Sequence, residues 1–512
     1  MDGPTGGWLN GSTTIRLLRV LAIATLVGAF LFMIVHTLRW PLMQDAQVIH
    51  YANFLMDHGF APYRDIGDMN MPGAYLMERL GMLVFGPGDL GFRIYDLSLM
   101  GAMIIGMIAI AWPYDWLAGL FAGVLFAMIH ASDGPKGAGQ RDEVMAVLMV
   151  AGLAFLFHSV RKTSPAWMAL GGFFFGMATS VKPTIAPLGV LLLGMAVLVL
   201  RRRGARVLPF VLYGVSGGAV PAAIFVGFLL HYHAVHAFFD LNRTITAYYA
   251  QLNRWPFIGL LRECMPRPMR LLVPFALPVA AMNPDRRNWE RWALALGVAF
   301  GAFSYFVQGK GFYYQRYPLI ALTLLWFGIE LSVAAGRKGI VRVLGTVGLA
   351  IGIFGLTPLF ASRTRTVFYS NIFTETLEAD LQTIGVDRLQ RDVQCLDMVD
   401  GCMNALYHLQ IVQQTGLTGD NLLFPPDSSL PVVQRYRQEF WNALVVRPPD
   451  VFVISDEKFL DPASFDKLDR WPLFAGYLAD HYDLYSAHSF NEITVAYRIY
   501  VRKGSFADGQ EH

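Results

Sequence analysis

An acidic loop directly after the first apolar segment holds the residues best suited to chemistry. The loop spans residues 39–93, is rich in turn-forming residues, and carries Asp45, Asp65 and Asp68. A carboxylate held just outside a bilayer can take a proton from a hydroxyl group as a general base, or accept hydrogen bonds from the hydroxyls of a ligand. A pore or a passive anchor has little use for such carboxylates, so the loop favours an enzyme.

Asp45 begins a segment with the pattern of an amphipathic helix. Val48, Ala52 and Leu55 recur at helical spacing, which predicts a helix that ends at Asp57. We expect this helix to rest on the bilayer and to hold Asp45 in its first turn, at the depth of the lipid headgroups. Aspartate is also a common helix cap, so Asp45 can be a cap, a general base or both.

Asp65 and Asp68 lie on either side of Ile66-Gly67. Aspartate beside glycine and proline is explained by turn chemistry alone. The functional alternative is a clamp for sugar hydroxyls or a site for a divalent cation, because hard cations prefer carboxylate oxygens. The spacing of acids and histidines matches no recognised metal motif, so we predict no metal requirement and no other cofactor.

Cations accompany these acids in later loops. Arg141 lies in the loop Ser132–Glu143, Lys182 precedes Pro183, and Arg316-Tyr317 opens a later apolar segment. Arginine can bind a phosphate through two hydrogen bonds, while lysine acts as a point charge. Arginine, lysine and tyrosine are also ordinary anchors at a membrane surface. Together, on the membrane face that carries the acids, these residues predict binding of an anionic lipid substrate.

The rest of the chain must position these residues, and its composition is that of a membrane protein. It has 512 residues, of which 54% are hydrophobic and 15% are charged, against about 25% charged residues in soluble domains. Apolar segments of near-spanning length predict a polytopic α-helical membrane protein with about eleven transmembrane helices in residues 1–360. The predicted spans are Leu17–Leu38, Ile94–Trp112, Trp116–Ala131, Val144–Val160, Trp167–Val181, Thr184–Leu200, Val207–Leu230, Leu271–Met282, Trp292–Val307, Leu319–Ala335 and Val341–Phe360.

The distribution of lysine and arginine predicts the orientation in the membrane. Alternate loops carry the basic clusters Arg161-Lys162, Arg201-Arg202-Arg203, Arg286-Arg287 and Arg337-Lys338. These loops are expected to be cytoplasmic, together with the N-terminus, while the opposite loops hold most of the acids. The net charge of +3 comes from such short clusters and gives no indication of nucleic-acid binding.

Residues 361–512 have the pattern of a separate small α/β domain on the outer face. Helices are predicted at Asn371–Thr383, Leu430–Val445 and Ser464–His481, and strands at Val393–Met398, Asp450–Ser455 and Thr494–Val501. A segment of this size can bury a core of its own. The chain has three cysteines, and Cys395 and Cys402 can either form a local disulfide in an oxidising compartment or remain buried thiols, with Cys264 unpaired.

The order of these motifs resembles that of GT-C fold glycosyltransferases that use polyprenyl-phosphate sugars, specifically the bacterial relatives of protein mannosyltransferases and aminoarabinose transferases. The similar features are Asp45, Gly59-Phe60-Ala61-Pro62-Tyr63-Arg64-Asp65, Pro72, Phe85-Gly86, Arg93, Lys182-Pro183 and Arg316-Tyr317-Pro318. Two features depart from that pattern. Ala46 follows Asp45 where the family often has a second acid, which leaves a lone carboxylate as base. Asn70-Met71-Pro72-Gly73 replaces the common Lys-Pro-Pro, which bears on donor specificity.

The resemblance implies transfer of a sugar from a polyprenyl phosphate to a hydroxyl of an envelope glycan, lipid or protein. The reaction would take place on the outer face of the bacterial inner membrane and invert the anomeric centre. Asp45 would take the proton of the acceptor, and Lys182 and Arg316 would stabilise the departing phosphate. Asp65, Asp68, Arg141 and Tyr317 complete the expected substrate site.

Two other classes of membrane protein are alternatives. A transporter would predict ionisable residues near the span centres, often in repeated halves. Asp96 and Glu330 instead lie near span ends, and no repeat is visible. A polymerase or ligase of lipid-linked glycans would favour a large central outer loop, whereas this chain has its outer domain at the C-terminus.

Overall fold

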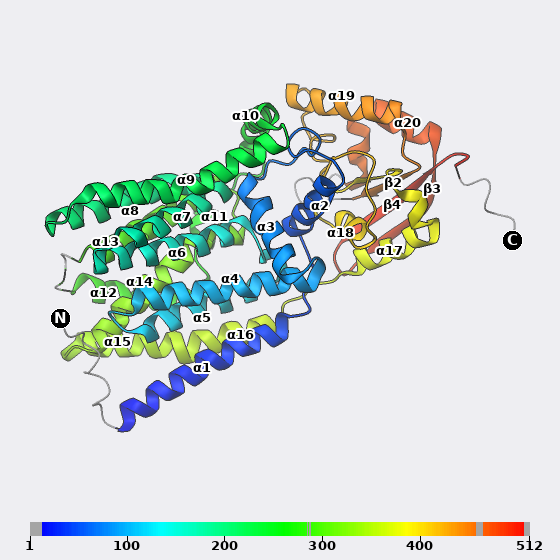
Figure 1. The fold of residues 1–512 in the computed structure, drawn as a ribbon. Coiled ribbons are helices and arrows are strands. Elements are labelled where there is room, and N and C mark those ends of the chain that lie inside the picture. Colours follow the sequence, from blue (N-terminus) through cyan, green and yellow to red (C-terminus); the bar gives the residue numbers. More distant parts are fainter. Residues whose placement is uncertain (1–12, 284, 286–287, 457–463, 506–512) are drawn as a thin grey trace.

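The computed structural model describes residues 13–283, 285, 288–456 and 464–505. It consists of a bundle of long helices with a smaller domain, built on a sheet, at one end of the bundle (Figure 1). The predicted basic cluster Arg286-Arg287 lies outside the described residues.

Each predicted span coincides with helical structure in the bundle. The bundle helices are α1 (Thr13–Thr37), α4 (Gly88–Ala111), α5 (Trp116–Asp133), α6 (Arg141–Lys162), α7 (Pro165–Val181), α8 (Ala186–Arg202), α9 (Val207–His231), α12 (Val273–Ala281), α13 (Trp289–Gln308), α14 (Tyr317–Ala335), α15 (Gly339–Ala350) and α16 (Thr357–Arg365). Within the described ranges, eight helical segments are long and apolar enough to cross a membrane. Helix α7 is shorter, with 17 residues, and α12 has nine. The multi-pass character therefore follows from the structure, while the count of about eleven spans stays a prediction.

Glycines let two bundle helices approach closely. A methyl group on Gly217 of α9 would lie 1.9 Å from the carbonyl oxygen of Ala169 in α7, and one on Gly172 of α7 would lie 2.0 Å from the carbonyl oxygen of Gly214. Small residues at helix contacts are the usual means of packing helices in a membrane, because dispersion contacts replace the hydrophobic effect there. Gly172 and Gly214 also line an apolar groove beside the two helices.

The first outer loop contains two helices, α2 (Asp45–Asp57) and α3 (Pro72–Phe85). The predicted bounds of α2 agree with the structure, but the prediction that it rests on the bilayer is wrong. Ten of its 13 residues are buried. The reason is that the C-terminal domain covers it: the amide of Gln413 donates to the Tyr51 hydroxyl (2.9 Å), which donates to the carbonyl of Ile411 (3.0 Å). The helix lies between protein surfaces, and its polar residues bond to protein groups.

Two further helices, α10 (Val235–Gln251) and α11 (Phe257–Glu263), lie between α9 and α12 in the chain. Neither helix is among those predicted from the sequence. Arg435 of the C-terminal domain forms an ion pair with Asp240 of α10. Lys310, between α13 and α14, donates to the carbonyl of Tyr249 (2.5 Å) and so holds the other end of α10. Helix α10 is thereby attached to both parts of the molecule.

The C-terminal domain is a mixed four-stranded sheet with helices around it. Its elements are α17 (Ile372–Ile384), β1 (Val393–Leu396), α18 (Cys402–His408), α19 (Pro431–Val446), β2 (Val451–Ser455), α20 (Pro472–His481), β3 (Tyr482–Phe490) and β4 (Val495–Arg502). The strand order is β1-β2-β4-β3, with β1 parallel to β2 and the other neighbours antiparallel. Strand β3 and helix α18 are not among the elements predicted from the sequence. Cys395 and Cys402 form a disulfide, which resolves the two alternatives and fits an oxidising compartment.

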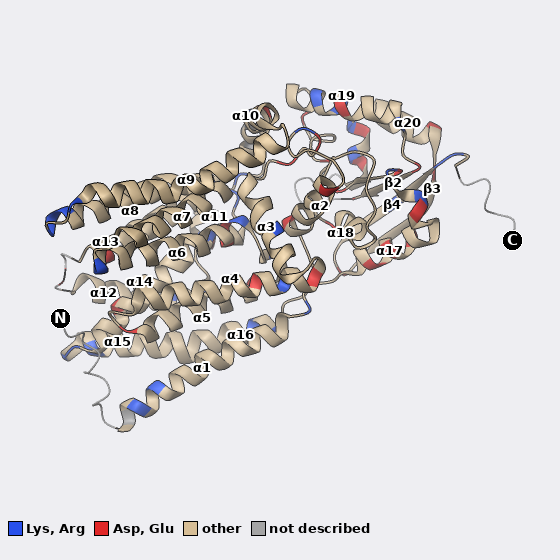
Figure 2. Cartoon of the chain, viewed as in Figure 1, with Lys and Arg blue, Asp and Glu red and all other residues tan. Residues whose placement is uncertain are grey.

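Charged residues are distributed unevenly along the bundle (Figure 2). Basic residues gather where α8 ends and where α1 begins, at the end of the bundle far from the sheet. The junction of bundle and C-terminal domain carries acids and bases together, around α2, α3 and the start of α4. The candidate site lies at this junction.

Candidate active site

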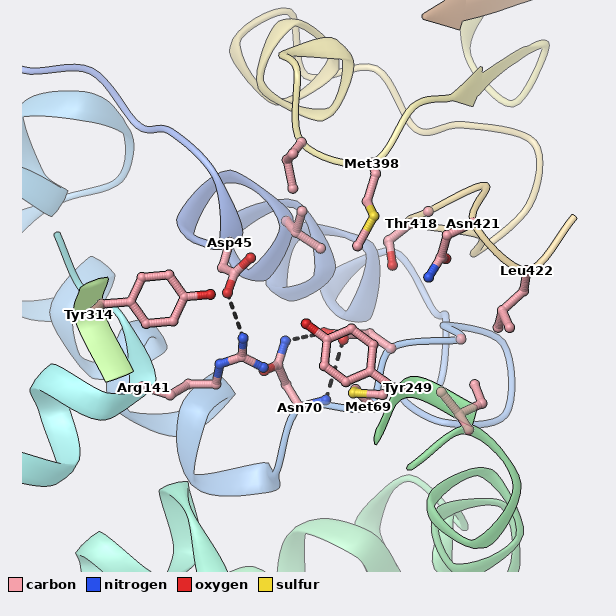
Figure 3. A pocket seen from close by; sticks show the side chains of 16 residues that line it. Asp45, Met69, Asn70, Arg141, Tyr249, Tyr314, Met398, Thr418, Asn421 and Leu422 are labelled. Carbon is pink, nitrogen blue, oxygen red and sulfur yellow. Dashed lines mark hydrogen bonds and ion pairs between the residues drawn. The ribbon is translucent and has the colours of Figure 1, made fainter. Parts of the chain in front are cut away.

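A cavity of about 110 Å³ lies between the bundle and the C-terminal domain (Figure 3). The outer loop, α6, α10 and the segment before α14 form one wall, and two loops of the C-terminal domain form the other. The labelled lining residues are Asp45, Met69, Asn70, Arg141, Tyr249, Tyr314, Met398, Thr418, Asn421 and Leu422. Both parts of the chain are therefore needed to enclose this space.

Asp45 and Arg141 face each other in the cavity. The Arg141 guanidinium donates through Nη2 to Oδ2 of Asp45 at 2.5 Å, and through Nη1 to Oδ1 of Asn70. The amino group of Asn70 donates to Oδ2 of Asp68 at 2.6 Å, and the Tyr75 hydroxyl donates to the same oxygen at 2.8 Å. These bonds form one polar network that runs from Asp45 to Tyr75.

The side chain of Asp45 is not the cap of helix α2. Gln44 is the N-cap residue, and it makes no side-chain hydrogen bond to the helix. Asp45 is the first helical residue, and its carboxylate points into the cavity toward Arg141 (Figure 3). The side chains of Asp45 and Arg141 are 25% and 26% exposed, so a small molecule in the cavity can reach both.

Lys182 lies next to this network but does not line the cavity. Its ammonium group donates to Oδ1 and Oδ2 of Asp142 at 2.6 and 2.7 Å and to Oε1 of Gln308 at 2.7 Å. Burial lowers the pKa of Lys182, and the carboxylates of Asp142 and Asp45 oppose that shift. Since Asp142 follows Arg141 in the chain, the ion pairs Asp45–Arg141 and Asp142–Lys182 are adjacent.

Arg316, the second predicted phosphate ligand, also has protein partners. Its guanidinium donates to Oδ1 of Asp133 at 2.9 Å and to the carbonyl of Glu263 at 3.1 Å. Arg316 does not line the cavity, but Tyr314, two residues earlier, does.

Asp65 and Tyr317 lie outside the cavity. Asp65 accepts hydrogen bonds from Arg64 and from the amide of Ala61 (2.7 Å), so its carboxylate fixes the turn that precedes Asp68. Tyr317 is buried at the start of α14, with its ring 5.4 Å from that of His130. Of the residues named from sequence, Asp45, Asp68 and Arg141 meet in the cavity. Lys182 and Arg316 do not line it, and each pairs with a carboxylate of its own.

A second charged cluster lies beneath the first turn of α6. Arg93 donates to Oδ2 of Asp96 and to the hydroxyl of Thr37. Nε2 of His130 lies 3.2 Å from Oδ1 of Asp96, and Nδ1 lies 3.9 Å from Oε2 of Glu143. Carboxylate and imidazole atoms of Asp96, His130 and Glu143 lie within 4.8 Å of one another and could hold a metal ion. The cation that the structure itself supplies there is Arg93.

Several lining residues were not identified from the sequence. Tyr249 lies on α10, and burial raises its pKa, which keeps the phenol neutral and able to donate. Thr418 and Asn421 come from a loop of the C-terminal domain, opposite Asp45 (Figure 3). No local motif marks these residues, because they reach the cavity only when the two parts of the chain dock.

An apolar groove of about 540 Å³ runs beside α7, α8 and α9. It is lined mainly by glycines and aliphatic side chains, among them Gly172, Gly176, Leu193 and Val226. Its lining also includes Ser180 and Pro183, the residues that lie close to Lys182 on either side. The groove thus extends from the apolar part of the bundle to the segment of the chain that carries Lys182.

No protein-family model and no curated protein sequence matches the chain. Solved structures match it by fold. ArnT from Cupriavidus metallidurans bound to undecaprenyl phosphate aligns over 96% of this chain and 99% of its own, with a TM-score of 0.58 and 14% sequence identity. The Archaeoglobus fulgidus oligosaccharyltransferase AglB, in complex with an inhibitory peptide and a dolichol-phosphate, aligns over 94% of this chain and 74% of its own, with a TM-score of 0.50 and 13% identity.

The likeness extends over nearly the whole chain, including the C-terminal domain. At these identities it establishes the fold, and the GT-C fold implied by the order of the sequence motifs is confirmed. The chain is therefore a GT-C fold membrane protein whose C-terminal domain is docked on the loop that follows its first long helix.

Proposed function

We propose that the protein is a membrane glycosyltransferase that moves a sugar from a polyprenyl phosphate to a hydroxyl group on the outer face of the bacterial inner membrane. The observation that carries this proposal is the cavity in which an accessible carboxylate, Asp45, pairs with Arg141, next to the ion pair of Asp142 and Lys182 and near an apolar groove. The full-length fold likeness to a protein that binds undecaprenyl phosphate supports it.

In this reaction Asp45 is the general base. The acceptor hydroxyl gives its proton to the Asp45 carboxylate while its oxygen forms a bond to the anomeric carbon of the sugar. The bond from that carbon to the phosphate oxygen breaks, and its electron pair stays on the departing polyprenyl phosphate. Attack from the face opposite the phosphate inverts the anomeric centre, through an oxocarbenium-like transition state. The proton then leaves Asp45 for solvent or for the phosphate.

The donor lipid is assigned to the apolar groove and its phosphate to the neighbouring cations. Isoprenoid chains are apolar, so the glycine-lined space beside α7 and α9 suits them. Lys182 lies in the chain between Ser180 and Pro183 of the groove lining, and it pairs with Asp142, which follows the cavity residue Arg141. Arg316 follows Tyr314 of the cavity lining by two residues. Cations held in place by protein partners stabilise the charge that develops on the leaving phosphate. For this reason we expect no metal requirement.

The C-terminal domain is assigned to the acceptor side. Thr418 and Asn421 offer uncharged hydrogen-bonding groups on the wall opposite Arg141 (Figure 3). An acceptor on this wall would approach the sugar from the side away from the phosphate, as inversion requires. An envelope glycan, a lipid or a protein can supply the hydroxyl.

The test is mass spectrometry of cell-envelope glycans from strains with the intact gene, with the gene deleted, and with Asp45→Asn. We expect one glycan modification to be lost in the deletion and in Asp45→Asn, and to be retained in the control Asp57→Asn. Asp57 lies on the same helix but pairs with Arg79, and its side chain is 52% exposed. An unchanged glycan profile in the deletion strain would refute the proposed function.

A further inference from the structure

Each cation assigned to the donor phosphate already has a carboxylate partner. Arg141 pairs with Asp45 at 2.5 Å, Lys182 with Asp142 at 2.6 Å, and Arg316 with Asp133 at 2.9 Å. A phosphate that enters this region must therefore either share a cation with a carboxylate or displace that carboxylate. The three pairs differ in how easily this can happen.

The Asp45–Arg141 pair is the one open to exchange. Both of its side chains line the cavity, and each is about a quarter exposed, at 25% and 26%. Asp142 is only 2% exposed and is bound through both of its oxygens, while Arg316 and Asp133 are 9% and 13% exposed. Separating a buried pair leaves an uncompensated buried charge, whereas a pair in contact with solvent loses much less when its partner changes.

Arg141 is also tethered so that it can exchange one partner without leaving its place. Its Nη1 donates to Asn70, whose amino group is held by Asp68. The backbone carbonyl of Asn70 accepts a hydrogen bond from the Tyr63 hydroxyl at 2.6 Å. The guanidinium therefore keeps the Asn70 contact when Nη2 turns from the Asp45 carboxylate to another anion, since arginine carries five donors.

We propose that the phosphate of the donor takes the place of Asp45 on Arg141 and thereby releases the Asp45 carboxylate to act as the base. In the structure, Oδ2 of Asp45 is occupied by the hydrogen bond from Nη2 of Arg141. Once Arg141 binds the phosphate instead, the Asp45 carboxylate can accept a hydrogen bond from the hydroxyl group of the sugar acceptor. Donor binding then comes before activation of the acceptor. This inference rests on the proposed function, because it takes a lipid phosphate as the ligand.

The decisive measurement is the affinity of purified full-length protein for undecaprenyl phosphate in a double-mutant cycle. Asp45→Asn removes the competitor for Arg141, so we expect it to bind the lipid about fivefold more tightly than the wild type, the effect of losing a partly exposed ion pair. Arg141→Ala should bind it about tenfold more weakly, because a charge-assisted hydrogen bond to the phosphate is lost. The double variant should bind like Arg141→Ala alone.

Two results of the cycle would overturn the inference. If Asp45→Asn tightens binding equally with and without Arg141, Asp45 acts only by repelling the phosphate. If Asp45→Asn leaves the affinity unchanged or lowers it, the two anions do not compete. Asp57→Asn removes one negative charge elsewhere on α2 and should leave the affinity unchanged. Arg141→Lys keeps the cation. If adding Asp45→Asn to this variant raises its affinity for undecaprenyl phosphate, the exchange is supported. If the affinity does not rise, the result counts against the exchange.

The same experiment separates this inference from the proposed function. Wild-type protein that does not bind undecaprenyl phosphate at all would refute the lipid-phosphate donor, and the exchange with it. Wild-type binding without the expected coupling would refute the exchange alone. Thermal unfolding of each variant shows that the folded protein is being compared.

Discussion

Two charged clusters lie at the end of the bundle next to the C-terminal domain, one in the cavity and one beneath the first turn of α6, and they differ in their access to water. In the cavity, Asp45 and Arg141 are about a quarter exposed, at 25% and 26%. Beneath it, the side chains of Arg93, Asp96, His130 and Glu143 are at most 1% exposed. Helix α6 supplies both clusters, because Arg141 faces the cavity and Glu143, two residues later, faces inward.

The comparison shows that similar residue types serve different purposes according to burial. A carboxylate and a guanidinium in contact with a cavity can exchange partners with a ligand at little cost. The same groups sealed inside the protein lose a great deal of stability when one partner is removed. The buried cluster joins α1, α4, α5 and α6 through Thr37, Asp96, His130 and Glu143. It thereby holds the start of α6, and Arg141, in position.

The largest effect is expected in the cavity. Asp45→Asn should lower sugar transfer by about 10²- to 10⁴-fold, because a general base is lost. The free energy of unfolding should change by no more than about 1 kcal/mol, since the ion pair is partly exposed. Envelope glycan analysis and thermal unfolding of the purified protein measure the two quantities. Retained transfer would remove Asp45 as the base.

The buried cluster should show the opposite behaviour. Arg93→Met leaves Asp96 and Glu143 without their guanidinium neighbour and should lower the free energy of unfolding by about 3–5 kcal/mol. The exposed Arg79, which pairs with Asp57, is the matched control, and Arg79→Met should cost at most about 1 kcal/mol. Equal free energies of unfolding of the two variants, measured by thermal unfolding, would show that the buried cluster contributes no more to stability than an exposed ion pair.

A smaller effect is expected at the edge of the cavity. Arg316→Ala should raise the donor concentration needed for half-maximal transfer by about tenfold, through loss of a charge-assisted contact to the phosphate. Arg267→Ala is the control, because Arg267 is 82% exposed and pairs only loosely with Glu263, at 3.7 Å. Unchanged dependence on donor concentration in Arg316→Ala would discard its phosphate role.

The contact between the two parts of the chain should depend weakly on pH. Burial disfavours the charged form of His408, but hydrogen bonds to Asp89 and Glu378 outweigh it and raise its pKa from the usual 6.5. Protonated His408 therefore stabilises the folded protein fully below about pH 6.5, the pKa of an unperturbed histidine. This stabilisation is lost as the pH rises through the higher pKa that His408 has in the folded protein. The difference in melting temperature between wild type and His408→Gln should be largest in acid and vanish in alkaline buffer. A difference that grows with pH would contradict this assignment.

Metal removal should have no effect on transfer. Arg93 supplies a positive charge to the Asp96, His130 and Glu143 cluster, and Lys182 and Arg141 supply it near the donor phosphate. Activity measured before and after treatment with a chelator should therefore be equal. Loss of activity that a divalent ion restores would assign a metal to the buried cluster, which offers three ligand groups within 4.8 Å.

Much of the fold could be predicted from the chain alone, because hydrophobic length and period are local properties. The apolar runs coincide with helices from α1 to α16, and three of the four strands lie within or beside predicted segments. Strand β3 was not predicted, since its residues pair with β4 at the edge of the sheet and are mostly exposed. Helix α2 was placed on the bilayer because its apolar pattern does not reveal whether lipid or protein covers it.

The candidate site could be predicted only in part. Asp45, Asp68 and Arg141 were named from residue type and from their order along the chain, and they line one cavity. Asp65 was named by the same reasoning, yet its carboxylate holds the amide of Ala61. Turn chemistry and ligand binding use the same residue types, so only the position of the side chain separates them.

The sequence by itself determined the membrane character, the order of charged motifs and the change to mixed helices and strands after the last apolar run. These depend on composition and on spacing within short segments, where each residue acts through its neighbours in the chain. Tertiary structure decided which acid meets which base: Arg141 reaches Asp45 across 96 positions, and Lys182 reaches Asp142 across 40. It also brought Thr418 and Asn421 to the cavity. Pairings over such separations depend on how whole helices and domains pack, and no local pattern encodes them.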